Sequence, residues 1–138
     1  MVEEAISDLK SGSGARLYDL AGAMDTIAEV TNDPIFFIMP QAVGSFGSEI
    51  IQFHQLLLLP VLPQGIRERQ NQIMNACIDD VAKQLKIVVD EISKNPCPDH
   101  EAYSKAIGSI YKQGYILHRE RSVLMPRRMT WRPYVDEE

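Results

Sequence analysis

The chain has few of the residues on which metal binding and catalysis usually depend. Its 138 residues include two cysteines and three histidines. His54, His100 and His118 do not have the three- or four-residue spacing of ligands on one helix, and no Glu-x-x-His pattern accompanies them. Cys77 and Cys97 lack a CxxC arrangement, which indicates free thiols in a reducing compartment. We therefore expect no metal site, no cofactor and no enzymatic activity, with the histidines in core or capping roles.

The chain also lacks a long hydrophobic run. The longest apolar segment, LLLLPVLP at residues 56–63, is far shorter than the ~18 residues that a membrane-spanning helix needs. The segment MVEEAISDLK at the start has neither a basic beginning nor an apolar stretch, so we expect no secretory signal peptide. These absences predict a cytoplasmic protein, or one assembled in the cytoplasm into a particle, without a membrane span.

Residues 63–94 have the clearest pattern in the chain, that of one long amphipathic helix. Pro63 suits a first helical turn because its missing N–H has no helical partner there. Such a helix gains little stability alone in water, so other elements must cover its apolar face. We interpret it as the spine of a helical bundle. Its apolar side chains recur at steps of three and four residues and are Ile66, Ile73, Met74, Cys77, Ile78, Val81, Leu85, Val88, Val89 and Ile92.

Three further segments have the helical period and are joined by short links. One covers residues 15–30, a second begins at Gln41 or Ser45 and ends at Leu59, and a third begins at the N-cap residue Asp99 and ends before Pro126. The bare GxxG pair at 44–47 lacks flanking basic residues, and we interpret it as the start of the second of these helices. The sequence therefore predicts an all-α fold, an antiparallel bundle of about four main helices.

The remaining segments are predicted to be extended or irregular. Residues 35–39, IFFIM, have no sheet partner in the chain, so we expect an extended apolar connector pinned by Phe36 and Phe37. Residues 1–14 are acidic and then Gly/Ser-rich, which predicts a short helix or frayed arm and a flexible joint. Residues 126–138 are predicted to be an irregular tail, basic and then acidic, which leaves residues 15–125 as the bundle.

Charge is distributed unevenly along the chain, and this is its main functional signal. The net charge of −5 combines −8 in residues 1–102, +6 in residues 103–132 and −3 in residues 133–138. Clustered cations can neutralise the phosphates of a nucleic acid or the charges of another polyanion. The overall pI near 5.2 argues against a typical nucleic-acid-binding domain, but the local field matters more than the net charge.

The basic segment supplies two sets of candidate site residues. Its cations can neutralise a polyanion, and its aromatic side chains can stack on bases or anchor a protein partner. The candidate polyanion-binding residues are Lys105, Lys112, Arg119, Arg121, Arg127, Arg128 and Arg132. The candidate partner-anchoring residues are Tyr111, Tyr115, Trp131 and Tyr134.

Two features distinguish the cations of the last predicted helix. Lys105, Lys112 and Arg119 are seven residues apart and therefore share one helix face. Arg121 instead occupies a position in the apolar seam of that helix. A buried arginine needs a paired carboxylate, and the neighbouring Glu120 points away from the seam.

These features favour a non-catalytic helical subunit of a larger assembly, formed by self-association or with other proteins. Its basic C-terminal face would contact nucleic acid or another polyanion, as in a filament coat protein or a small subunit of a nucleoprotein complex. An accessory subunit of a multi-component enzyme, docking through protein–protein contacts alone, is the alternative. A third interpretation is a ligand-binding bundle with an apolar pocket formed by Phe36, Phe37, Phe46 and Phe53. Steep salt dependence would distinguish polyanion binding from the other two.

Overall fold

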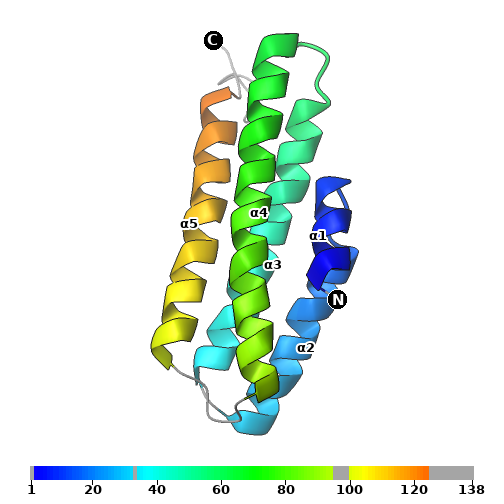
Figure 1. The fold of residues 1–138 in the computed structure, drawn as a ribbon. Helices are drawn as coiled ribbons and strands as arrows, with labels where there is room; N and C mark the ends of the chain where they lie inside the picture. Colours follow the sequence, from blue (N-terminus) through cyan, green and yellow to red (C-terminus); the bar gives the residue numbers. More distant parts are fainter. Residues whose placement is uncertain (1, 33, 95–99, 125–138) are drawn as a thin grey trace, which may run out of the picture.

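The protein is a bundle of helices packed side by side (Figure 1). The computed structural model describes residues 2–32, 34–94 and 100–124, and this part contains no strand. Its helices are α1 (Val2–Lys10), α2 (Ala15–Thr31), α3 (Pro34–Leu57), α4 (Gln64–Lys94) and α5 (His100–Leu124). The predicted all-α bundle is therefore confirmed. The predicted tail at 126–138 and the expected N-cap Asp99 lie outside the described residues.

The predicted spine helix is confirmed as α4, the longest helix of the described chain. Its apolar face is covered by α1, α3 and α5, which all pack against it. Met74, Ile78, Val81 and Leu85 are completely buried on that face. Because each buried aliphatic side chain contributes about 1.5–3 kcal/mol relative to an exposed one, this stripe is a main source of stability.

The expectation of an extended connector at residues 35–39 is wrong. These residues form the first turns of α3, which begins at Pro34, a residue suited to the first turn because it needs no N–H donor. Pro40 lies inside the helix, where it removes one helical hydrogen bond. Met39 and Pro40 are buried, so burial of the flanking apolar face offsets this loss. The pair at Gly44 and Gly47 consequently lies in the middle of α3 and not at its start.

Residues 1–14 were expected to form a short helix or a frayed acidic arm, followed by a Gly/Ser joint. Residues 2–10 form the short helix α1, which packs against α2 and α4. Val2, Ala5, Ile6 and Leu9 are buried in the same core as the other helices. The carbonyl of Leu9 accepts a hydrogen bond of 3.0 Å from Nε2 of His54 on α3, which fixes the end of α1. His54 thus has the expected capping role.

The core continues from α4 through α3 to α2. Leu17, Leu20, Met24 and Ala28 form the buried stripe of α2, as its period predicted. Asn32 ends α2 in the left-handed conformation, and its N–H donates to the Ala28 carbonyl over 2.8 Å. α2 therefore stops at the segment where the sequence predicted its end.

The order of the helices places α2 and α5 on opposite sides of the bundle (Figure 1). α3 packs against both of them, but α2 and α5 do not contact each other in the described part of the chain. Among the described residues, no helix is long and apolar enough to cross a membrane.

Candidate interaction surface

α5 presents a row of cations on its outer face. Lys105, Lys112 and Arg119, which their seven-residue spacing places on one helix face, are all exposed. Lys105 forms an ion pair of 3.5 Å with Glu101 one turn earlier on the same helix. Within the described residues Lys112 and Arg119 form no ion pair with an acidic side chain. These two side chains are therefore available to an external anion.

Arg121 does not belong to this row. Its guanidinium points toward α3, and its Nη2 lies 3.3 Å from Oε1 of Glu49. The exposed fractions of the two side chains are 18% and 19%, so the pair is largely removed from water. The carboxylate that a buried arginine needs is thus supplied by α3, while Glu120 accepts a hydrogen bond from the buried Gln70 on α4. Arg121 is structural in this arrangement and is not free to bind a polyanion.

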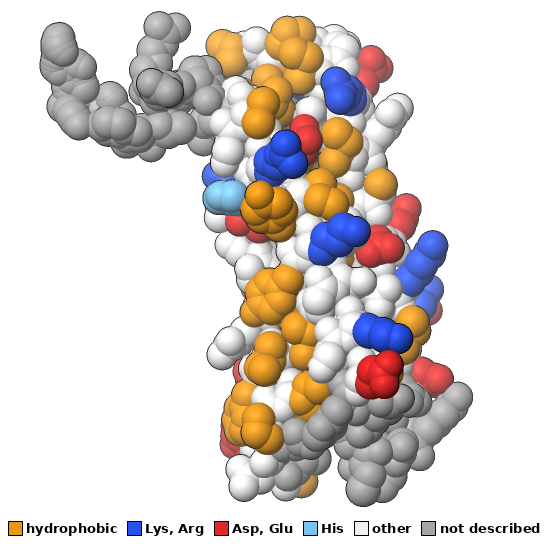
Figure 2. Space-filling view, turned by 90° about the vertical axis from the view of Figure 1, so that its left-hand side faces the viewer, with side chains coloured by type: hydrophobic (Ala, Val, Ile, Leu, Met, Phe, Trp, Pro, Cys, Tyr) orange, Lys and Arg blue, Asp and Glu red, His pale blue; other side chains and the backbone are white. Residues whose placement is uncertain are grey.

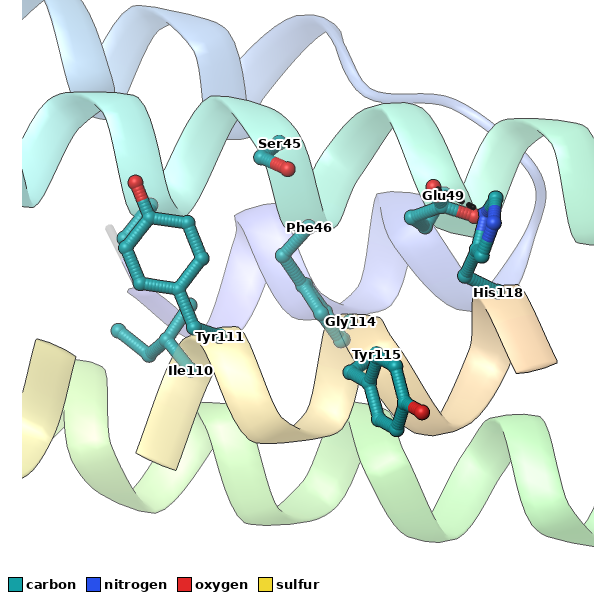
Figure 3. Close-up of a pocket in the computed structure, with 9 residues that line it drawn as sticks. Ser45, Phe46, Glu49, Ile110, Tyr111, Gly114, Tyr115 and His118 are labelled. Carbon is teal, nitrogen blue, oxygen red and sulfur yellow. Dashed lines mark ion pairs between the residues drawn. The ribbon is translucent and has the colours of Figure 1, made fainter. Parts of the chain in front are cut away.

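His118 completes the cluster formed by Glu49 and Arg121. Its Nδ1 lies 3.0 Å from Nη2 of Arg121 and 3.4 Å from Oε2 of Glu49 (Figure 3). A neutral Nδ1 without a proton accepts from the arginine, whereas a protonated Nδ1 donates to the carboxylate. The same nitrogen cannot do both, so the cluster has two alternative hydrogen-bond arrangements. The His118 side chain is half exposed, so the cluster lies at the edge of the bundle.

Tyr111 and Tyr115 flank a groove between α3 and α5 (Figure 3). The groove has a volume of about 210 Å³, and Phe46 of α3 points across it toward Gly114 of α5. Tyr111 is 43% exposed and Tyr115 is 64% exposed. Hydrophobic side chains on this side of the molecule lie next to lysine and arginine side chains (Figure 2). An aromatic strip and a cationic row therefore run side by side along α5.

Five of the predicted site residues lie outside the described residues. They are the cations Arg127, Arg128 and Arg132 and the aromatic residues Trp131 and Tyr134. Cys97 also lies in a segment that the structure does not describe.

Of the phenylalanines proposed as a ligand pocket, Phe37, Phe46 and Phe53 are not brought together in one cavity. Phe53 is completely buried in the core, and Phe37 is 43% exposed near the start of α3. Phe46 is buried and lines the groove between α3 and α5. These three side chains therefore do not form the apolar pocket that the third interpretation required.

Cys77 is buried on the apolar face of α4. Removal from water is the main cause that raises the pKa of its thiol to about 11, and the carboxylates of Asp80 and Glu120 add to this. A thiol with this pKa stays protonated at neutral pH, and the thiol form is a poor nucleophile and metal ligand. The described part of the chain also contains no group of three or more histidine, cysteine and acidic side chains that could hold a metal ion.

Glu49 was missed as a site residue, and of the groove residues of α3 only Phe46 had been named, as part of an apolar ligand pocket. Glu49 is a single acidic residue in an apolar helix, at PQAVGSFGSEII. An isolated carboxylate on an otherwise apolar helix is a signal that it has a cationic partner, and this signal was available in the sequence. Arg121, a cation at an apolar position of α5, indicated in the same way that a carboxylate partner exists elsewhere in the fold.

Comparison with known proteins supplies no relative from which a function could be transferred. No protein-family model, curated protein or solved structure matches this chain.

Proposed function

We propose that the protein is a non-catalytic structural subunit of a larger assembly, and that the outer face of α5 contacts a nucleic acid or another polyanion there. The observation that carries this proposal is the exposed pair Lys112 and Arg119, which no acidic side chain of the described residues neutralises. Their seven-residue spacing along α5 corresponds to about 10 Å, within the Debye length at moderate salt, so one extended anion can interact with both.

The neighbouring tyrosines support the same proposal. Tyr115 lies on the side of α5 next to the cations and is the more exposed of the two. Aromatic rings beside cations are suited to polyanions that also carry flat or apolar groups, since the rings stack or pack while the cations neutralise charge.

The direct test is the binding of a labelled single-stranded oligonucleotide, followed by fluorescence anisotropy at several salt concentrations. The charge reversal Lys112→Glu/Arg119→Glu should weaken binding by at least about tenfold. Each lost phosphate contact also reduces the slope of log K against log salt by about 0.7, so two lost contacts should reduce it by about 1.4.

The chain offers a matched control for this test. Arg69→Glu/Lys83→Glu changes the net charge by the same amount on the exposed side of α4, and neither residue forms an ion pair among the described residues. This control should bind almost as well as the unmodified protein. Equal weakening in both variants would mean that net charge and not the α5 face determines binding, and the proposal would fail.

A second candidate is an accessory subunit that docks on another protein without a polyanion. The groove between α3 and α5 and the exposed Tyr111 and Tyr115 beside it favour this candidate. Docking of this kind should depend weakly on salt. It should be lost in Tyr111→Ser/Tyr115→Ser and retained in Lys112→Glu/Arg119→Glu. For polyanion binding we expect the opposite, with the larger loss in the charge-reversal variant.

A further inference from the structure

α2 and α5 present opposite charges on surfaces that cannot meet within one molecule. Lys112 and Arg119 are exposed on α5, and Asp19, Asp25 and Glu29 are exposed on α2. In the described part of the chain, none of the three carboxylates forms an ion pair. The two helices lie on opposite sides of the bundle and do not contact each other in that part (Figure 1). Each face therefore lacks its counter-charge within the described part of the chain.

Part of the outer face of α2 is low between its carboxylates, although the same helix also exposes Tyr18 and Val30. Gly22 and Thr26 are exposed there. The Thr26 hydroxyl donates a hydrogen bond of 3.2 Å to the Gly22 carbonyl, so the hydroxyl has a partner within α2. A Cβ at Gly22 would meet no other atom within 4 Å. The described fold therefore does not require glycine at this position, although glycine costs about 1 kcal/mol of helix propensity relative to alanine. A low strip of this kind allows another helix with large side chains to approach closely.

α5 has the side chains that fit such a strip. Tyr111 and Tyr115 project beside Lys112 and Arg119, and they remain 43% and 64% exposed in the bundle. Gly108, on the same outer side, is also exposed, and a Cβ there would meet nothing within 4 Å. The two faces are thus complementary in charge.

We infer that the anionic partner of the α5 face is the acidic outer face of α2 in a second copy of this chain. This inference rests on the proposed function, because it names the partner of the same surface. The two patches are different, so the contact is heterologous: each copy offers α5 to one neighbour and α2 to another. Since the patches lie on opposite sides of the bundle, copies add head to tail instead of closing as a symmetric pair.

Charge reversal on either face should abolish this contact. Size-exclusion chromatography with light scattering, at low salt and over a concentration series, should give a mass for the unmodified protein that rises above the monomer mass of 15.6 kDa. Lys112→Glu/Arg119→Glu and Asp25→Lys/Glu29→Lys should each stay monomeric, because each variant has like charges on both of its faces. All four positions are exposed, so thermal unfolding should be unchanged and will show that both variants fold.

Mixing the two variants is the decisive step. The acidic α5 of one variant then meets the basic α2 of the other, and the basic α5 of the second meets the acidic α2 of the first. Association should therefore return in the equimolar mixture. It should also return in the single chain that carries all four reversals. Binding to nucleic acid alone predicts neither rescue, because in that case the charges of α2 are irrelevant.

The outcomes separate this inference from the proposed function. An unmodified protein that stays monomeric but binds the oligonucleotide through Lys112 and Arg119 overturns the inference and leaves the proposed function in place. A protein that stays monomeric and does not bind the oligonucleotide overturns both the inference and the proposed function. Association that survives the reversals, or that is not rescued by mixing, assigns self-assembly to another surface and also overturns the inference.

Discussion

Glu49 and Arg121 form an ion pair between α3 and α5, with 3.3 Å between Oε1 and Nη2, although 72 residues separate them in the chain. Each side chain is about four-fifths buried. Two charges in such a place stabilise the fold only as a pair, because each alone would be a poorly solvated ion. The pair therefore fixes the position of α3 relative to α5, the two helices that form the candidate groove.

Removing the carboxylate should destabilise the bundle. Glu49→Gln leaves the Arg121 guanidinium without its counter-charge, and we expect the free energy of unfolding to fall by about 1–3 kcal/mol. Urea unfolding followed by circular dichroism measures this change. His118→Ala is the control in the same cluster: because His118 is half exposed, it should cost less than about 1 kcal/mol. A Glu49→Gln variant as stable as the unmodified protein would show that the pair contributes nothing.

Two glycines should respond in opposite ways to alanine. Gly22→Ala meets no atom within 4 Å and should raise stability by about 0.5–1 kcal/mol through helix propensity. At Gly47, a Cβ would lie 2.9 Å from Cδ2 of the fully buried Leu17, so Gly47→Ala should lower stability by about 1–2 kcal/mol. Thermal unfolding of both variants compares them directly. A shift in the same direction for both would contradict the described packing of α2 on α3.

The hydrogen bond from His54 to the Leu9 carbonyl should hold α1 in place. In His54→Ala the Leu9 carbonyl loses its donor from α3 and keeps the Gly12 N–H of its own turn, and we expect a loss of about 1 kcal/mol that is concentrated at α1. Native-state hydrogen exchange should then show faster exchange for amides of α1 and little change in the middle of α4. His54→Gln keeps an N–H donor and should have a smaller effect. Uniform acceleration across all helices would mean that His54 supports the whole core and not the docking of α1.

The raised pKa of Cys77 predicts a loss of stability at alkaline pH. The thiol ionises near its ordinary value of 9.0 in the unfolded chain and near 11 in the folded chain. Its contribution is therefore fully present below pH 9 and is lost as the pH rises toward 11. Because lysines and tyrosines titrate in the same range, the measurement is the difference between the unmodified protein and Cys77→Val. If that difference did not change between pH 8 and pH 10.5, the thiol would not be shielded from water.

The same burial predicts slow chemical modification. In a Cys97→Ser background, where Cys77 is the remaining thiol, a disulfide reagent at pH 8 should react much more slowly with the folded protein than with the protein in urea. Equal rates would show that Cys77 is accessible.

The helix periods predicted most of the fold because burial follows them closely. α4 and α2 have apolar residues at regular steps, and most residues of the predicted stripes are buried, although Ile66 near the start of α4 is 38% exposed. The start of α3 was missed because two local signals pointed the other way. IFFIM is apolar on all sides, so it has no period, and Pro40 disfavours helix around it. Both signals are overridden by packing, since Met39, Pro40 and Ala42 are buried where α3 meets the rest of the bundle.

The candidate surface was predictable only in part. The placement of Lys105, Lys112 and Arg119 on one face depends on helix geometry alone, and all three are exposed. The groove and the pairing of Glu49 with Arg121 depend on which helices become neighbours, and this information is not local. Arg121 was placed with the polyanion-binding residues because its partner is distant in sequence. When one predicted helix has an isolated carboxylate among apolar residues and a second has a cation at an apolar position, the two charges should be considered as a possible ion pair.

The separation of charge between α5 and α2 also determines how the protein will behave on an ion-exchange resin. A pI near 5.2 predicts that at neutral pH the protein is retained by an anion exchanger and flows through a cation exchanger. A resin, however, interacts with the face that the molecule turns toward it, and the protein can present either one. At low salt the chain should therefore be retained by both kinds of resin, and the charge reversal at Lys112 and Arg119 should remove retention on the cation exchanger alone.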